Sequence, residues 1–238
     1  MVDVRDSYSE LKRIVHAFRG DNLWQRRQIR CERRWLGNEG ARWCVCPDEL
    51  SASSVIYSIG VGEDISFDLE LIRNFGVQVH AFDPTPRSIE WLQKQVLPQQ
   101  FVFHAYGAAD FDGKCSFHPP ANPEHVSHTL VERDTKRPSI QVPVYRLTSI
   151  MKMLGHERIS LLKMDIEGAE YDVLTDFLCS RIAVKQLLVE FHHRWPEIGV
   201  AKTKQAIQAL NEAGFRIFGI SSSGEEYSFL NVTSGPAQ

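Results

Sequence analysis

The sequence predicts an α/β domain built on a mostly parallel, twisted sheet with helices on both faces. From Ser54 onward, short apolar runs alternate with segments whose apolar residues recur at helical spacing. Two of the runs, 159–165 and 185–191, are apolar on both faces, as central strands of a parallel sheet are. A chain of 238 residues can bury one such core. We therefore expect one domain at 51–238 and a helical N-terminal extension at 1–50.

Each element is predicted from its own pattern. Strands are expected where apolar runs end at turn residues, at 54–60, 77–82, 101–105, 114–118, 159–165, 185–191, 215–220 and 227–230, and order is expected to return at 140–145 after the long loop. Helices are expected at 64–75, 86–96, 168–180 and 202–213. Pro86 suits a first helical turn, and Gly214 ends the last helix. In the extension, one apolar face predicts a helix over 7–18.

Composition and charge exclude several functional classes. The net charge is −3, which disfavours a nucleic-acid substrate. No apolar run approaches the roughly 18 residues of a membrane span, and no signal peptide is recognisable. The odd number of cysteines, five in all, is typical of reduced thiols. These observations predict a cytoplasmic protein without a nucleic-acid partner; they leave its oligomeric state open.

Two irregular segments are candidates for contacts outside the core. The arginine-rich run from Trp24 to Arg34 is interpreted as a solvated helix face rather than as a contact for an acidic partner. The loop from Pro119 to Pro138 is long and proline-rich. Loops of this length are uncommon unless they are functional or disordered, so we expect a lid over the substrate.

The first candidate binding motif runs from Ser58 to Asp64 and joins a strand to a helix. Gly60 and Gly62 let the backbone approach a ligand closely at a helix N-terminus. A third glycine would complete a dinucleotide fingerprint, but Ile65 stands there. The acids Glu63 and Asp64 would repel a pyrophosphate and tolerate an ammonium or sulfonium cation. Ser58, Gly60 and Gly62 are therefore candidate cofactor-binding residues.

The second motif places an acid at the end of the next strand. Asp83, followed by Pro84, lies 23 residues after Gly60, the separation at which an acid accepts hydrogen bonds from ribose hydroxyls. The alternative is an N-cap for the next helix. After the third strand, we expect Tyr106 to border an adenine and Asp110 to accept a hydrogen bond from the exocyclic amine of that base.

Two further strands deliver acids and a histidine to the same edge. Asp165 and Glu167 follow one strand, while Glu190 and His192 end the next. His192 could act as a general base, and Asp165 could orient the cofactor or the acceptor. The same Asp–Glu–His set could instead hold a divalent cation, although the sequence does not predict one. Glu170 is interpreted as a first-turn helix acid.

These motifs resemble those of the FkbM family of methyltransferases over Val55 to Asn231. The segment Leu161–Leu174 is close to the family's "IKIDVEGAE" stretch, and Leu187–His193 is similar to its "LLVEVH" strand. Ala81-Phe82-Asp83-Pro84 matches its "AFEP" segment. Ser58 stands where the family commonly has an acid. The glycine turn resembles that of a subgroup that includes methyltransferase-like proteins of animals.

The resemblance implies a Rossmann-like class I methyltransferase fold. It also implies methyl transfer from S-adenosylmethionine, usually to a hydroxyl oxygen of a sugar or natural product, that is, to a small-molecule or glycan acceptor. Two alternatives remain open at the level of the sequence. One is an NAD-linked oxidoreductase, which the missing third glycine disfavours. The other is a non-catalytic cofactor-binding module.

Overall fold

The computed structural model describes residues 23–117 and 140–233. The predicted helix at 7–18 and the loop at 119–138 lie outside the described residues. Every strand expected between 54 and 230 is present in the described part, with ends that shift by one or two residues. The fold-class prediction, a mostly parallel α/β sheet, is confirmed.

A seven-stranded sheet forms the centre of the domain. Its order is β5 (Phe101–His104), β4 (Gln78–Phe82), β3 (Val55–Ile59), β9 (Arg158–Met164), β10 (Ala183–Glu190), β12 (Glu226–Asn231) and β11 (Phe215–Ile220). The pairs from β5 to β10 are parallel, while β12 is antiparallel to both neighbours. This is the doubly wound order with β12 inserted before the last strand. The strand order reverses between β3 and β9, which is where ligands of such sheets bind.

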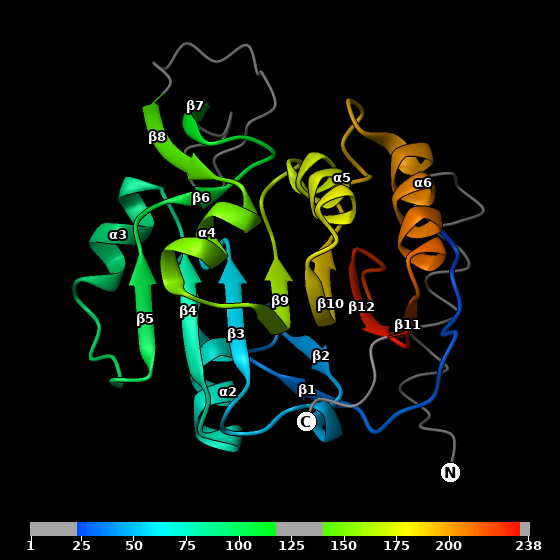
Figure 1. Cartoon of the computed structure of the whole chain (residues 1–238), viewed down its shortest axis with the longest axis horizontal. Helices are drawn as coiled ribbons and strands as arrows, with labels where there is room; N and C mark the ends of the chain where they lie inside the picture. The colour runs from blue at the N-terminus through cyan, green and yellow to red at the C-terminus, as the bar shows by residue number, and fades with distance from the viewer. Residues whose placement is uncertain (1–22, 118–139, 234–238) are drawn as a thin grey trace.

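Helices cover both faces of this sheet (Figure 1). One face carries α4 (Leu147–Leu154), α5 (Glu170–Ser180) and α6 (Gly199–Glu212). The other carries α2 (Ser66–Phe75) and α3 (Pro86–Leu92). Strand side chains alternate between the two cores: Tyr57 packs on the first face and Ile56 on the second. Both faces of the parallel strands are therefore buried, as their apolar sequences predict.

A small second sheet lies beyond the carboxyl ends of β4 and β5 (Figure 1). It consists of β6 (Gly107–Ala108), β8 (Ile140–Tyr145) and β7 (Gly113–Phe117), in that order. β7 pairs with β8 in an antiparallel register, and β6 pairs with β8 in parallel. The sheet places Gly107, Ala108 and Phe117 next to the carboxyl edge of the main sheet.

The described part of the extension contains strands rather than an α-helix. β1 (Arg34–Leu36) and β2 (Trp43–Val45) pair antiparallel, and a 3-10 helix follows at Pro47–Glu49. The interpretation of 24–34 as a helix face is wrong for this reason: residues 24–33 are extended or irregular, and the Gln28 N–H donates to the Ile217 carbonyl at 2.7 Å. The segment lies along the main domain and packs β2 onto its second core.

Other differences have local causes. α3 ends at Leu92 instead of 96 because the next amides, of Lys94 and Gln95, donate to carbonyls three residues back, as in a 3-10 turn. α4 was not predicted; it is short, and no side chain caps its start. Among the described residues, no helix has the length and apolar character needed to cross a membrane.

Candidate active site

The turn after β3 can be made only by glycine at its first position. Gly60 has φ +75, and its N–H donates to the Phe82 carbonyl at 2.8 Å. A Cβ atom at position 60 would lie 1.7 Å from the carbonyl oxygen of Asp165. Gly62 has φ +56 and open space around it. Gly60 therefore lets β3 and β9 approach each other, whereas Gly62 leaves room above the turn.

A cavity of about 480 Å³ opens at this turn, within the size range of small-molecule sites. Its walls come from the carboxyl ends of β3, β4, β9 and β10, from the small sheet and from the N-terminal segment. Six of the predicted site residues line it, namely Gly60, Gly62, Asp83, Pro84, Asp165 and Glu190. The sequence thus located the cavity at the switch point of the sheet.

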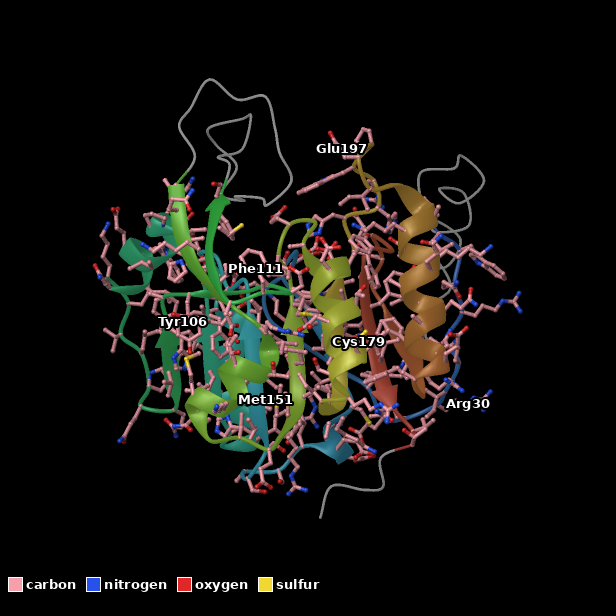
Figure 2. The ribbon with its side chains drawn as sticks, turned by 45° about the horizontal axis from the view of Figure 1, so that its top comes forward. Arg30, Tyr106, Phe111, Met151, Cys179 and Glu197 are labelled. Atoms are coloured by element: carbon pink, nitrogen blue, oxygen red, sulfur yellow. The ribbon has the colours of Figure 1, made fainter. Side chains whose placement is uncertain are left out.

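The other predicted site residues lie elsewhere. Ser58 is completely buried within β3 and does not line the cavity. Tyr106, which is labelled in Figure 2, packs against Phe82 with ring centroids 5.6 Å apart and also lies outside the lining. Asp110 is exposed and outside it. His192 is buried and is not part of the cavity wall.

Asp83 ties the glycine turn to the start of α3. One carboxylate oxygen accepts the Gly62 N–H at 2.9 Å. The other accepts the N–H of Thr85 at 2.9 Å and its hydroxyl at 2.7 Å. A carboxylate offers about four acceptor positions, so about one remains for a ligand. Asp83 therefore serves both the N-terminal end of the helix and the cavity.

Asp165, Glu190 and His192 converge beside the cavity, as the sequence predicted. One possible ligand atom from each lies within 4.8 Å of the others. The His192 Nε2 atom lies 3.3 Å from Glu167 and 3.9 Å from Asp165. Its Nδ1 atom lies 3.2 Å from Glu170. The imidazole therefore stands between carboxylates on both sides.

Glu170 is the first-turn acid of α5 that the sequence predicted, and it makes further contacts. It is fully buried. Its carboxylate accepts the backbone N–H groups of Gly168 at 2.9 Å and His192 at 3.1 Å, as well as facing the His192 ring. Glu167 next to it has φ +53, a conformation that non-glycine residues rarely adopt. The start of α5 is thus bound to the end of β10 through His192.

The carboxylates set the charge of His192. Burial lowers the pKa of this imidazole, but hydrogen bonds to Glu167 and Glu170 outweigh burial and raise it to about 11. Both ring nitrogens then carry protons, in agreement with a carboxylate facing each one. A charged imidazole cannot accept a proton, so this environment argues against the general-base role expected for His192.

Asp165 and Glu190 line the cavity wall, and their raised pKa values favour the neutral, protonated acids. Burial raises the pKa of Asp165. Burial and the neighbouring Asp165 carboxylate raise the pKa of Glu190 to about 9, so Glu190 carries a proton at neutral pH. Lys163 lies 3.8 Å from Asp165 and favours its ionised form. Of the two acids, Asp165 is therefore better placed to be the anion.

The raised pKa of Glu190 has a measurable consequence for stability. The folded chain holds this proton up to about pH 9, whereas an unfolded glutamate titrates near 4.5. The contribution of Glu190 is complete below about pH 4.5 and is lost as the pH rises through about 9. Relative to Glu190→Gln, the wild type should lose about 1 kcal/mol or more of unfolding free energy between about pH 5 and pH 8. Denaturant titrations at both pH values measure the difference.

The matched control for this measurement is Glu197→Gln. Glu197 is exposed and follows β10 in the next loop (Figure 2). Its stability difference from the wild type should stay constant with pH. If the Glu190→Gln and wild-type stabilities run parallel with pH as well, the assignment of a proton to Glu190 is incorrect.

Lys163 is a site residue that the sequence analysis missed. It interrupts an apolar strand, is 5% exposed, and its Nζ atom donates to the Gly60 carbonyl at 2.5 Å and to that of Ile59 at 3.3 Å. The ammonium lies 5.3 Å from the centre of the Trp43 ring, which belongs to the N-terminal segment. A buried lysine needs such partners. The two hydrogen bonds of Lys163 in turn stabilise the glycine turn.

Asp68 was also missed because it lies in a helix whose polar residues were expected outside. It is 2% exposed, lines the cavity, and one of its oxygens has no hydrogen-bond partner among the described residues. Burial raises the pKa of Asp68 to about 6. A buried acceptor without a partner is costly, which makes Asp68 a candidate acceptor for a ligand's donor group.

Residues 55–217 match the family model described as the methyltransferase FkbM domain. The chain belongs to the FkbM methyltransferase family. The resemblance found in its motifs is thereby confirmed. The match begins at β3 and ends in β11, so it contains the glycine turn and the acids Asp68, Asp83, Asp165, Glu167, Glu170 and Glu190.

Two curated relatives are named probable methyltransferase-like protein 24. The rat protein is 28% identical over 195 residues, and the human protein is 26% identical over 195 residues. In both cases the alignment covers 74% of this FkbM-family chain and 47% of the relative. The chain therefore spans about half the length of the curated relatives it matches.

Two solved structures are similar to the chain. One is the methyltransferase FkbM of Methylobacillus flagellatus, with a TM-score of 0.47 and 14% identity, covering 76% of this chain and 44% of that one. The other is Aeropyrum pernix fibrillarin in complex with S-adenosyl-L-methionine, with a TM-score of 0.40 and 10% identity, covering 90% and 86% of the two chains.

Proposed function

We propose that this FkbM-family protein is an S-adenosylmethionine-dependent methyltransferase that acts on a hydroxyl oxygen of a sugar or other natural product. The observation that carries the proposal is the charge of the cavity wall. The cavity wall contains two cationic side chains, those of Arg42 and Lys163. It also contains a larger set of acids: Glu63, Asp64, Asp68, Asp83, Asp165, Glu167, Glu190 and Glu226. Such a wall suits a ligand with ammonium and sulfonium groups.

The same wall disfavours the dinucleotide alternative. A pyrophosphate needs backbone N–H groups and cations at the helix N-terminus. Here Glu63 and Asp64 line the cavity just before α2. Asp64 already accepts the Ser66 N–H at 2.8 Å, and Glu63 lies 2.9 Å from Arg87. An NAD-linked oxidoreductase is therefore the weaker proposal.

The chain offers a partner for each part of the cofactor. The open acceptor position of Asp83 suits a ribose hydroxyl. The unpartnered oxygen of Asp68 suits the ammonium of the methionine end. Gly107 and Ala108 line the cavity where an adenine would extend from the ribose, so these backbone groups replace Tyr106 and Asp110 as our candidates for the base.

S-adenosylmethionine, when bound, supplies an electrophilic methyl group on its sulfonium. The protein then has to hold the acceptor in line and remove its proton. Asp165 lines the cavity and is held between Lys163 and His192, so we assign the proton-accepting role to its carboxylate. His192 and Glu170 position Asp165 and Glu167 from behind the wall.

Calorimetric titration with S-adenosylhomocysteine tests the cofactor assignment. The wild type should bind this ligand and not bind NAD. Asp83→Asn should weaken binding by about tenfold or more, because a charge-assisted hydrogen bond is lost. Asp48→Asn is the matched control, since Asp48 is exposed and lies outside the cavity lining.

Three outcomes decide the cofactor proposal. Unchanged affinity in a folded Asp83→Asn variant would remove Asp83 from the ribose site. Binding of NAD alone would favour the oxidoreductase. Binding of S-adenosylhomocysteine without turnover on any hydroxylated acceptor would favour the non-catalytic module, whose only supporting feature is Ser58 in place of the family's acid.

A further inference from the structure

We infer that the carboxyl ends of β9 and β10 form a binding site for one divalent cation of the Mg²⁺ or Mn²⁺ class. Asp165, Glu190 and His192 would be its protein ligands. The inference that a cation binds here stands on the geometry of these side chains. The role of that cation in methyl transfer rests on the proposed function.

The spacing of the ligand atoms is the first argument. Oxygen and nitrogen ligands lie about 2.1 Å from such a cation, so ligands on opposite sides of it are about 4.2 Å apart. In the structure, one atom each from Asp165, Glu190 and His192 already lie within 4.8 Å of one another. No other Asp, Glu, His and Cys cluster with this property occurs among the residues the structure describes.

The orientation of the histidine is the second argument. Histidine ligands usually donate their second ring N–H to a carboxylate, which fixes the ring and makes the ligand nitrogen more basic. Glu170 provides that carboxylate: it is fully buried and lies 3.2 Å from Nδ1. The Nε2 atom consequently points toward Asp165 and Glu167.

The excess of acids is the third argument. Asp165, Glu167, Glu170 and Glu190 gather around one imidazole and the ammonium of Lys163. Lys163 lies 3.8 Å from Oδ2 of Asp165, whereas Oδ1 is the oxygen that faces His192. The Asp165 carboxylate also makes a side-chain hydrogen bond with Glu190, so an ion between the two acids would replace the proton of that bond. Asp165 and Glu190 both line the cavity, so an ion between them would be reachable by an acceptor's oxygen.

A cation in this position has a clear use if the proposed function holds. An acceptor hydroxyl bound to a divalent ion loses its proton more readily, because the ion stabilises the alkoxide. The proton would pass to the Asp165 carboxylate or to water, and the oxygen would attack the methyl carbon as the sulfonium leaves as a neutral thioether. The two carboxylate ligands favour Mn²⁺ or Mg²⁺, whereas the imidazole alone would also suit Zn²⁺.

The inference is tested by titrating the chelator-treated protein with Mn²⁺. The concentration of free ion is measured at each step by electron paramagnetic resonance. We expect one saturable site per chain. Asp165→Asn and Glu190→Gln should each weaken it about tenfold or more, and Glu170→Gln should also weaken it, because outer-shell partners cost about 10- to 100-fold in affinity. The matched control is Asp172→Asn. Asp172 lies in α5, as Glu170 does, but pairs with Lys202 outside the cluster. This variant should bind Mn²⁺ as the wild type does.

A second readout protects the test against misfolded variants. Saturating Mn²⁺ should raise the Tm of the wild type and of Asp172→Asn, but not that of Glu190→Gln. The inference is overturned if the wild type lacks a saturable site, or if folded Asp165→Asn and Glu190→Gln variants bind Mn²⁺ as the wild type does. Calorimetry separates this failure from that of the proposed function: S-adenosylhomocysteine binding without Mn²⁺ binding removes only the cation, and the reverse result removes only methyl transfer.

Discussion

Replacing Asp165 with asparagine is expected to lower the rate of methyl transfer by about 100-fold or more, the size of effect that a lost proton-transfer group produces. Asn keeps the shape of the side chain and removes its charge. Asp165 is the acid that lines the cavity while facing both Lys163 and His192. The loss should appear in kcat, measured with the first acceptor on which the wild type shows turnover.

The affinity for S-adenosylhomocysteine separates this role from a structural one. If Asp165 acts on the acceptor, the Asp165→Asn variant should bind this ligand within a few-fold of the wild type and keep a similar Tm. His192→Gln should lower kcat as well, through the orientation of Asp165 and Glu167. Near-normal turnover in both variants would rule out this catalytic centre.

The second large effect is expected at Gly60. Gly60→Ala would place a Cβ atom 1.7 Å from the Asp165 carbonyl oxygen, a backbone atom that cannot rotate away. The variant also requires a φ of +75 from alanine. Together these should lower the unfolding free energy by about 3 kcal/mol or more, or prevent folding.

Gly62→Ala is the matched comparison. Gly62 has a similar φ of +56, but nothing lies within 4 Å of the added atom. We expect a cost of about 1 kcal/mol from backbone strain alone. Equal losses in the two variants, measured by denaturant titration, would show that the contact with Asp165 does not determine the need for Gly60.

The regular elements of the fold were predictable because their signals are local. β9 and β10 are long apolar runs, and each is followed by the acids that mark the carboxyl edge. β1 and β2 have three residues each and β6 has two, which is too short for any periodic pattern. They form because their partners and the second core hold them, and those contacts are distant in sequence.

The buried face of α2 shows how a helix can hide an acid. The apolar residues Ile65, Leu69 and Ile72 recur at helical spacing, and the structure buries Ile65 and Ile72 and half-buries Leu69. The buried face is wider than these three residues indicate, because it also includes Phe67, Asp68 and Leu71. No acid was expected on this face, so the sequence analysis did not identify Asp68 as a residue of the cavity wall.

The site was predicted where strand ends determine it and missed where tertiary contacts do. Asp83 and Asp165 directly follow strands and Glu190 ends one, so their edge of the sheet was predictable. Lys163 lies inside a strand, and its role depends on Trp43, which comes from a segment expected to be a separate extension. The charge of His192 depends on Glu167 and Glu170, whose burial no sequence pattern indicates.

A crystal structure of the chain with S-adenosylhomocysteine tests the central claim most directly. The account predicts the ligand in the cavity at the switch point of the sheet, with a ribose hydroxyl on Asp83, the ammonium on Asp68, and the sulfur directed toward Asp165. A ligand bound away from the Gly60 turn, or one whose ribose and ammonium contact neither Asp83 nor Asp68, would contradict it.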